Sequence, residues 1–212
     1  MQNFGTKVAA QSKFYLIFVR KKGSMFSLDN FINDCKKSVT QDSSHLAVKE
    51  SIERAISSPK EILKELGEPK KSGVNKLYVS DTLTILNLVW APMMTIMPHN
   101  HQMWAVIGIY SGREDNTFWR RIEDKNDGRI EAAGAKNLGV GDVTPLGKDI
   151  IHSVTNPIPR FSAALHVYGG NFFQTPRSEW DAETLVEKNY DVEKNLFLFK
   201  KFDQNFTENK MK

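Results

Sequence analysis

Three histidines in the middle of the chain are the residues best able to carry out chemistry. His99 and His101 are separated by a single residue, and His152 follows much later, at the end of an apolar run. If the first two lie on a strand, their imidazoles share a face and point into one cavity. Three neutral imidazoles are donors suited to iron, zinc, nickel or copper. An isolated pair with this spacing is usually a surface feature, so the prediction of a metal site depends on the surrounding sequence.

His166 and Tyr168 form a second pair at alternating positions, again within an apolar run. On a strand both would face the same cavity, with Tyr168 as a proton donor and His166 as its partner. Two plainer interpretations stay open. A histidine on an apolar strand is often a hydrogen-bonded part of the core, and tyrosine is common in strands because it packs well there.

The residues around these histidines predict a closed β structure. Short runs rich in β-branched and aromatic residues alternate with turn residues, as expected for a sandwich or a barrel. The expected strands cover 76–79, 83–90, 93–97, 104–110, 117–121, 130–132, 142–144, 150–154 and 162–168.

Helical patterns precede this region. Apolar residues recur at helical spacing over 27–37, 44–56 and 59–66, with serines as caps and a proline opening the third helix. Near the end of the chain, 196–202 predicts a last helix or strand and 203–212 a frayed end. The predicted division is a leader over 1–25, a helical segment over 26–70 packed on a barrel over 71–175, and a C-terminal extension over 176–212.

The composition narrows the class of protein. Hydrophobic residues make up 40% of the chain, the formal net charge is +4, and Cys35 is the only cysteine. No apolar run approaches the ~20 residues that cross a bilayer, and the basic residues are scattered rather than gathered into a nucleic-acid-binding patch. We therefore expect neither a membrane nor a nucleic acid as a partner. The expected location is the cytoplasm, with organelle targeting through the basic N-terminus as the alternative.

The order of the key residues resembles the two motifs of the cupin double-stranded β-helix. In the first motif the histidine pair is followed by a glutamate and later by a glycine; here Ala105 replaces the glutamate, Gly112 fits, and Met93 replaces the opening glycine. The second motif is matched, with two extra residues before the histidine, by Gly139, Pro145, Gly147, His152 and Asn156. The resemblance implies a mostly β cupin barrel, here with an α-helical N-terminal segment.

The absence of the glutamate makes the chain similar to the thiol dioxygenases, and to cysteine dioxygenase in particular. That family carries a Ser-x-His-x-Tyr strand shortly after its third ligand, matched here by His166 and Tyr168 with Ala164 in place of the serine. The resemblance implies that His99, His101 and His152 hold Fe(II), with His166 and Tyr168 beside it.

This sequence departs from cysteine dioxygenase at two points, one beside the tyrosine and one in the residue that binds the substrate. Val106 replaces the cysteine that is cross-linked to the tyrosine in the animal enzymes, so Tyr168 is expected to be an ordinary phenol. The stretch over 78–81 lacks the arginine that binds the substrate carboxylate. The remaining candidates for that role are Arg113, Arg120, Arg121 and Arg160. L-cysteine is therefore not the expected substrate.

Three neutral histidines leave a divalent iron with its full charge and an open face, which an anionic substrate such as a thiolate or enolate can complete. We expect an iron-dependent, thiol-dioxygenase-like oxidoreductase that adds dioxygen to a small substrate, with nickel or zinc as other metals that the site could hold. The alternatives are a diketone-type cupin dioxygenase, and a cupin that binds a metal and a small ligand without turnover. A monomer or a homodimer is expected.

Overall fold

Two antiparallel β-sheets face each other and form the body of the protein. The computed structural model describes residues 25–41, 45–123 and 127–210, so the leader expected over 1–25 lies outside it except for Met25. The first sheet contains, in spatial order, β1 (Gly73–Val79), β2 (Thr84–Trp90), β9 (Ser162–Tyr168), β4 (Ala105–Ser111) and β7 (Val143–Leu146). The second contains β11 (Glu187–Asn189), β10 (Ser178–Trp180), β3 (Thr95–His99), β8 (Ile151–Thr155), β5 (Arg113–Arg121) and β6 (Ile130–Gly139).

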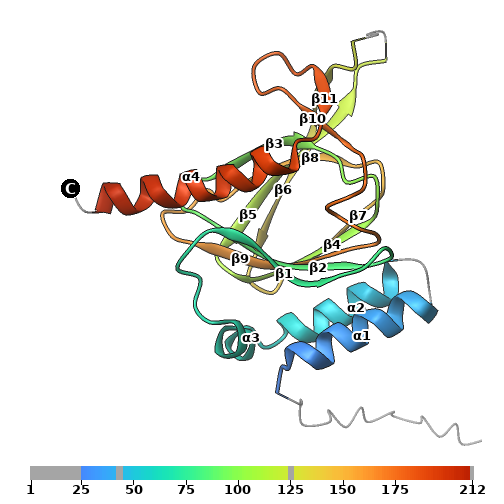
Figure 1. Ribbon diagram of the computed structural model, residues 1–212, viewed down its shortest axis with the longest axis vertical. Coiled ribbons are helices and arrows are strands. Elements are labelled where there is room, and N and C mark those ends of the chain that lie inside the picture. Colours follow the sequence, from blue (N-terminus) through green and yellow to red (C-terminus); the bar gives the residue numbers. More distant parts are fainter. Residues whose placement is uncertain (1–24, 42–44, 124–126, 211–212) are drawn as a thin grey trace, which may run out of the picture.

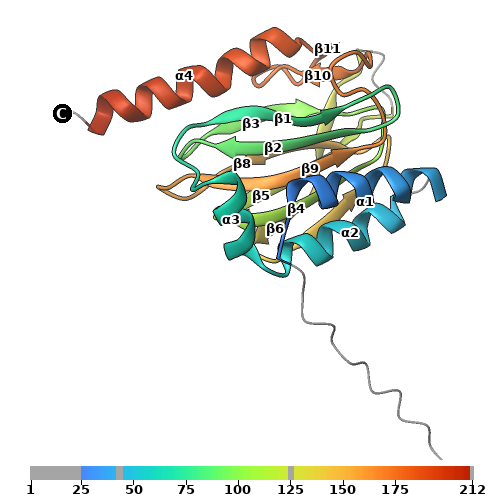
Figure 2. The same cartoon turned by 60° about the horizontal axis from the view of Figure 1, so that its bottom comes forward.

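Helices pack against this pair of sheets on two sides of the molecule. Three of them precede the first strand: α1 (Leu28–Gln41), α2 (Leu46–Ile56) and α3 (Pro59–Leu66). They pack on the outer face of the five-stranded sheet, whereas α4 (Val192–Lys210) lies on the opposite side, against β1 (Figures 1 and 2). Pro59 occupies the first turn of α3, where its missing N–H leaves no hydrogen bond unmade.

The five-stranded sheet is buried on both faces, which explains its almost continuous apolar runs. All seven residues of β2 and of β9 are buried. Successive side chains alternate between two clusters: Leu86 and Leu88 face the barrel interior, while Ile85 and Val89 face the helices. The same alternation places His166 and Tyr168 of β9 on the interior face.

Two glycines allow this close packing. A Cβ at Gly108 on β4 would lie 2.3 Å from a side-chain carbon of Ile52, so α2 can approach the sheet only because this residue has no side chain. Gly112, which matches the end of the first cupin motif, has a φ of 77° in the tight connection between β4 and β5.

The mostly β, two-sheet barrel of cupin type with helices at its N-terminus is confirmed. The strand order and the uniformly antiparallel pairing carry this assignment. Among the described residues, no helix combines the length and the apolar character needed to cross a membrane.

Several element boundaries differ from the prediction. β5 begins at Arg113 instead of 117, because polar residues that resemble a turn are paired with β6 on one side and β8 on the other. β10 and β11 lie in the expected C-terminal extension yet join the six-stranded sheet. The last helix runs to Lys210, well beyond the point where fraying was predicted.

Candidate metal centre

The three predicted ligands come together inside the barrel. His99 ends β3 and lies directly opposite His152 of β8 in the antiparallel ladder. His101 follows in the segment after β3, so the prediction that both histidines of the pair lie on one strand is wrong for His101. Its ring nevertheless faces the other two, and one ligand nitrogen from each histidine lies within 4.8 Å of the others.

Hydrogen bonds orient two of the rings. Nδ1 of His99 lies 2.9 Å from the carbonyl oxygen of Met97, and Nδ1 of His152 lies 2.8 Å from Oδ1 of Asn116. Both oxygens can only accept, so each Nδ1 carries the proton and donates it. The Nε2 lone pairs of His99 and His152 are therefore free to bind a metal, and a partner that fixes the tautomer in this way is typical of metal-ligating histidines.

The spacing of the nitrogens fits a divalent ion. Nε2 of His101 and Nε2 of His152 are 3.3 Å apart. Two nitrogen ligands at about 2.1 Å from a metal, at tetrahedral or octahedral angles, are themselves roughly 3.0–3.4 Å apart. Among the described residues no carboxylate joins the cluster. The donor set is thus three imidazoles and no acid.

Burial keeps these imidazoles neutral. Burial lowers the pKa of His99 from 6.5 to about 4, although the hydrogen bond to Met97 opposes the shift. Burial also holds the pKa values of His101 and His152 well below the ordinary value, and the neighbouring histidines lower them further. Neutral rings with free lone pairs are the form that a metal requires.

Two buried asparagines, Asn100 and Asn156, hold the backbone around the site in place. The side-chain oxygen of Asn100 accepts a hydrogen bond from the backbone N–H of Ser178 on β10, and the backbone N–H of Asn100 donates to the carbonyl of Ser178. Asn156, which matches the end of the second cupin motif, donates to three backbone carbonyls of Trp90, Ala91 and Arg160. Its role is to fix the loops beneath the site.

The second predicted pair lies beside the cluster. Nδ1 of His166 is 3.1 Å from the hydroxyl oxygen of Tyr168, and the Tyr168 ring meets the His101 ring edge-on with centroids 5.0 Å apart. Burial raises the pKa of the Tyr168 phenol well above its usual value; Tyr190 and Glu114 add to the rise, and Arg177 opposes it. Tyr168 is therefore a protonated phenol facing the cluster.

Glu114 was judged from its spacing not to be a metal ligand, but its position beside His166 was not predicted. This glutamate is fully buried, and its Oε1 lies 3.7 Å from Nε2 of His166. Asn116 was missed for the same reason: the strand was expected to begin at 117. Alternation of Glu114, Asn116 and Phe118 along one face of a longer strand was the signal available in the sequence.

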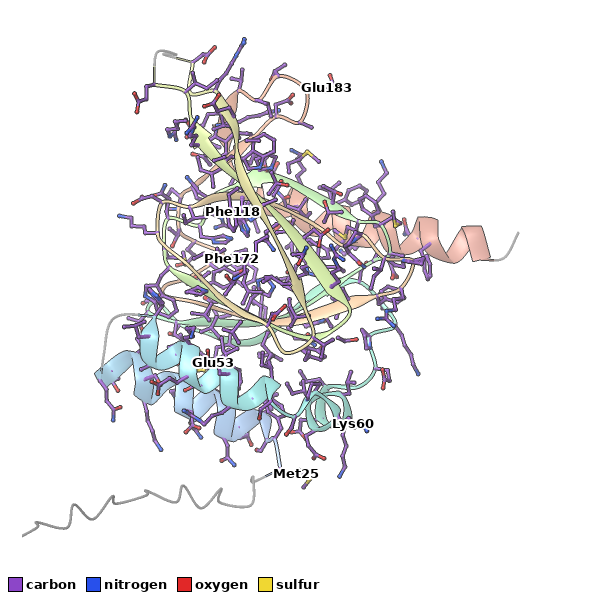
Figure 3. All side chains as sticks on the ribbon, turned by 180° about the vertical axis from the view of Figure 1, so that it is seen from behind. Met25, Glu53, Lys60, Phe118, Phe172 and Glu183 are labelled. Atoms are coloured by element: carbon purple, nitrogen blue, oxygen red, sulfur yellow. The ribbon has the colours of Figure 1, made fainter. Side chains whose placement is uncertain are left out.

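A cavity of about 40 Å³ adjoins the histidines. Its walls are mostly apolar apart from the five predicted site residues, and Tyr190 with α4 closes one side. The other lining residues are Val74, Leu88, Trp90, Ile96, Val154, Phe172, Tyr190, Val192, Asn195, Leu196 and Phe199. Figure 3 shows Phe172 and Phe118 between the two sheets, where Phe118 lies opposite His152 in the β5–β8 ladder. The space admits only small molecules.

None of the four arginines considered as an anion anchor lies in this cavity. Three of them pair with acidic residues on the surface and Arg160 is exposed; the pairs are Arg113–Asp115, Arg120–Glu131 and Arg121–Glu187. Arg177, which the sequence did not single out, is buried between the rings of Phe172 and Tyr190, at 4.2 and 4.0 Å from their centroids. Its positive charge contributes to the lowered pKa values of His99 and His101.

Comparisons with known proteins give similarities of fold. No protein-family model matches this chain. An RmlC-like cupin family protein with a double-stranded β-helix fold from Methanocaldococcus jannaschii is 14% identical, with a TM-score of 0.40, over 50% of this chain and 85% of that one. A Bacillus halodurans protein is 13% identical, with a TM-score of 0.40, over 47% and 71%.

A deletion mutant of Bacillus subtilis oxalate decarboxylase is 17% identical, with a TM-score of 0.39, and is matched over 51% of this chain and 28% of that one. Similarities at this level concern the fold alone. The assignment of the barrel rests on the strand order and register, and the chemistry of the site rests on its own residues.

Proposed function

We propose that this protein is a non-haem iron oxygenase of the thiol-dioxygenase type, with His99, His101 and His152 as the metal ligands. The observation that carries the proposal is the donor set: three buried, neutral imidazoles without a carboxylate, next to a buried phenol. When bound, Fe(II) would supply the redox chemistry and the open positions at which an anionic substrate and dioxygen meet.

The protein's own residues would supply orientation, dryness and a proton. Asn116 and Met97 hold two ligand rings in the tautomer that leaves Nε2 free. Apolar side chains and α4 exclude bulk water, which strengthens electrostatic interactions in the cavity. Tyr168, with His166 behind it, is the proton donor nearest to the ligands.

The electrostatics favour an anionic substrate. A metal held by neutral ligands keeps its double positive charge, and the buried guanidinium of Arg177 adds to the positive potential at the cluster. Arg177 is not part of the cavity lining, so it would attract an anionic substrate through its charge and not through direct contact. A small thiol, bound as its thiolate, meets these demands.

The apolar lining favours one alternative, a diketone dioxygenase acting on an enolate. An enolate supplies the same negative charge as a thiolate but needs fewer polar contacts for the rest of the molecule. The third alternative, a metal-holding cupin without turnover, needs the same ligands and differs only in consuming no oxygen.

Metal analysis and oxygen uptake test the proposal. Protein purified without chelators or nickel columns should contain close to one iron per chain by elemental analysis. The iron-loaded protein should consume oxygen with at least one of three probes: 3-mercaptopropionate, cysteamine or acetylacetone. Uptake with a thiol supports the proposal, and uptake with acetylacetone alone supports the diketone reading.

Two controls make the result specific. Zinc-loaded protein has the same ligands and no redox chemistry, and the variant His152→Ala lacks one ligand, so both should consume no oxygen. An iron-loaded protein that binds the probes and consumes no oxygen with any of them would overturn the enzymatic proposal and leave the binding protein.

A further inference from the structure

Glu114 is one of two buried acids among the described residues, and the proposed function uses neither. The other, Glu179, is hydrogen-bonded by Lys194 and Asn195. Neither carboxylate oxygen of Glu114 has a hydrogen-bond partner among the described residues, and the side chain is 0% exposed. In the described part of the chain, Nε2 of His166 is also buried without a hydrogen-bond partner. An unsatisfied buried polar group destabilises the folded state, so two of them side by side need an explanation.

The two unsatisfied groups face each other. Oε1 of Glu114 lies 3.7 Å from Nε2 of His166, and the two residues come from β5 and β9, strands of different sheets that approach inside the barrel. This separation is too long for a hydrogen bond, which has its donor and acceptor about 3 Å apart. A movement of roughly 0.7 Å, within the reach of side-chain rotation, would close the gap and satisfy both groups at once. Such contacts are often long until a site is loaded.

We propose that Glu114 is a positioning residue whose carboxyl group hydrogen-bonds Nε2 of His166 and so completes a relay, Glu114–His166–Tyr168, that ends at the histidine cluster. The proposal rests on the proposed function only for its catalytic consequence. Its structural content, one hydrogen bond that fixes the His166 ring, concerns the protein with or without a metal.

The relay has a defined effect on Tyr168. An imidazole ring with both nitrogens engaged cannot turn, so the 3.1 Å contact between His166 Nδ1 and the Tyr168 hydroxyl is held in place. The direction of the phenolic O–H then depends on which His166 nitrogen carries the proton, and Glu114 controls that nitrogen. A carboxylate that fixes the tautomer of a histidine in this way has large effects on catalysis in other enzymes.

The relay Glu114–His166–Tyr168 can also take up one proton from the cavity. A group in the cavity that loses a proton gives it to the Tyr168 oxygen, Tyr168 passes its own proton to Nδ1 of His166, and Nε2 passes its proton to the carboxylate of Glu114. One proton leaves the cavity and one arrives on Glu114, so the imidazole carries no net charge before or after. For a thiol substrate, this is the proton released when the thiolate forms.

A rival partner for Glu114 lies on the same strand. Asn116 shares the interior face of β5 with Glu114, and its Nδ2 is also buried without a hydrogen-bond partner among the described residues. Repacking could pair the two side chains of β5 with each other instead of bridging to β9. The experiment therefore has to report on His166 itself.

Nitrogen-15 NMR of the histidine rings gives that report without a metal or a substrate. The chain has only five histidines, so the signal of His166 can be assigned by its absence in His166→Gln. Glu114→Leu replaces the carboxyl group with an apolar side chain of similar size. In this variant the His166 shifts should change to those of a different or mixed tautomer. The signals of His99 and His152 should keep their wild-type shifts. In Glu114→Gln, which keeps a hydrogen-bonding group but cannot take up a proton, one His166 tautomer should persist.

Asp115→Asn is the matched control, because Asp115 is the neighbouring residue on the outward face of β5, where it pairs with Arg113. It should leave all five histidine signals unchanged. Unchanged His166 shifts in both Glu114 variants would overturn the relay and favour the pairing with Asn116.

If the iron-loaded protein consumes oxygen, the catalytic consequence is measured as well. Iron-normalised kcat should fall at least tenfold in both Glu114 variants, with KM little changed, because neither can exchange the proton. A wild-type kcat in Glu114→Gln would overturn the proton exchange while the NMR result still decides the positioning. Absence of oxygen consumption would count against the proposed function alone.

Discussion

Ala105 on β4 lies directly opposite Tyr168 on β9, at the position where the cupin motif carries its glutamate. Both side chains belong to the interior cluster, and Ala105 is completely buried. A methyl group here leaves room for the phenol next to the histidines. The small side chain at position 105 and the position of the Tyr168 phenol beside the histidines are therefore linked.

Restoring the carboxylate should change the metal site. In Ala105→Glu we expect the metal to bind at least tenfold more tightly in competition with a chelator, because an anionic ligand is added to three neutral ones. The extra volume should cost about 1–3 kcal/mol of stability in the metal-free protein. Ala105→Gln adds the same volume without the charge, so a comparison of the two separates ligation from crowding. Equal metal affinity in both variants would contradict the expected geometry.

Removing a ligand should release the metal and spare the fold. His101→Ala and His152→Ala should each retain little metal after dialysis, since two imidazoles hold a divalent ion far less tightly than three. Far-UV circular dichroism should remain that of the wild type, because the barrel is held by its apolar clusters rather than by the site. His45→Ala, at the start of α2, is the matched control and should keep its metal. Full metal content in both ligand variants would refute the assignment.

Asn116 should affect the affinity for the metal although it is not a ligand. Replacing it with leucine removes the acceptor 2.8 Å from Nδ1 of His152 and frees the ring to change tautomer. Loss of such a partner typically weakens metal binding about 10–100-fold. Chelator competition measures this. The control is Asn75→Leu on β1, whose amide donates to a backbone carbonyl of β2, in the other sheet from His99 and His152. Unchanged affinity in Asn116→Leu would show that the hydrogen bond does not orient the ligand.

Tyr168→Phe separates the proposed catalytic role from a packing role. If the phenol is the proton donor, iron content should stay at the wild-type level and iron-normalised turnover should fall about 100-fold or more. If it only packs, turnover should be unchanged and stability should fall by roughly 1 kcal/mol. Tyr110→Phe is the control: that hydroxyl is also buried and donates to Asn87, but the ring faces the helices. A turnover equal to that of the control would refute the proposed role of Tyr168 as a proton donor.

The sequence was sufficient to predict the barrel and the three clustered histidines for a simple reason. Strands buried on both faces are mostly apolar, so β2, β4 and β9 are easily recognised in the sequence. Alternation then determines which side chains share the interior, and it places His166 and Tyr168 together. At His101 the spacing correctly predicted that the ring faces His99 and His152. It wrongly predicted a strand there, because the backbone after β3 is irregular.

Residues whose position depends on distant pairing gave weaker signals in the sequence. Glu114 and Asn116 look like turn residues, and only the two neighbouring strands make them part of β5. Arg177 and Tyr190 come from the C-terminal segment, whose short strands β10 and β11 are too polar to be recognised by pattern. Their place beside the cluster follows from the contact of β10 with β3, which no local signal in the sequence encodes.

Acid should destabilise the metal-free protein over a defined pH range. Burial lowers the pKa of His99 from 6.5 to about 4, so between these values the unfolded chain takes up a proton that the folded protein excludes. The unfolded state then binds more protons, and the free energy of unfolding falls as the pH decreases from about 6.5 towards 4. At 1.36 kcal/mol per pKa unit, His99 alone would account for at most about 3 kcal/mol, and His101 and His152 shift in the same direction.

Urea unfolding of the metal-free protein at pH 7 and pH 5 measures this effect. Wild type should lose about 2 kcal/mol or more between the two pH values. His99→Asn, which cannot titrate, should lose less, whereas His45→Asn, outside the cavity, should match the wild type. Above about pH 7.5 the His99 variant and the wild type should show the same slope, because the histidine is then almost fully neutral in both the folded and the unfolded state. Equal losses in wild type and His99→Asn between pH 7 and pH 5 would show that this imidazole is not held neutral by burial, and would remove one argument for a preformed metal site.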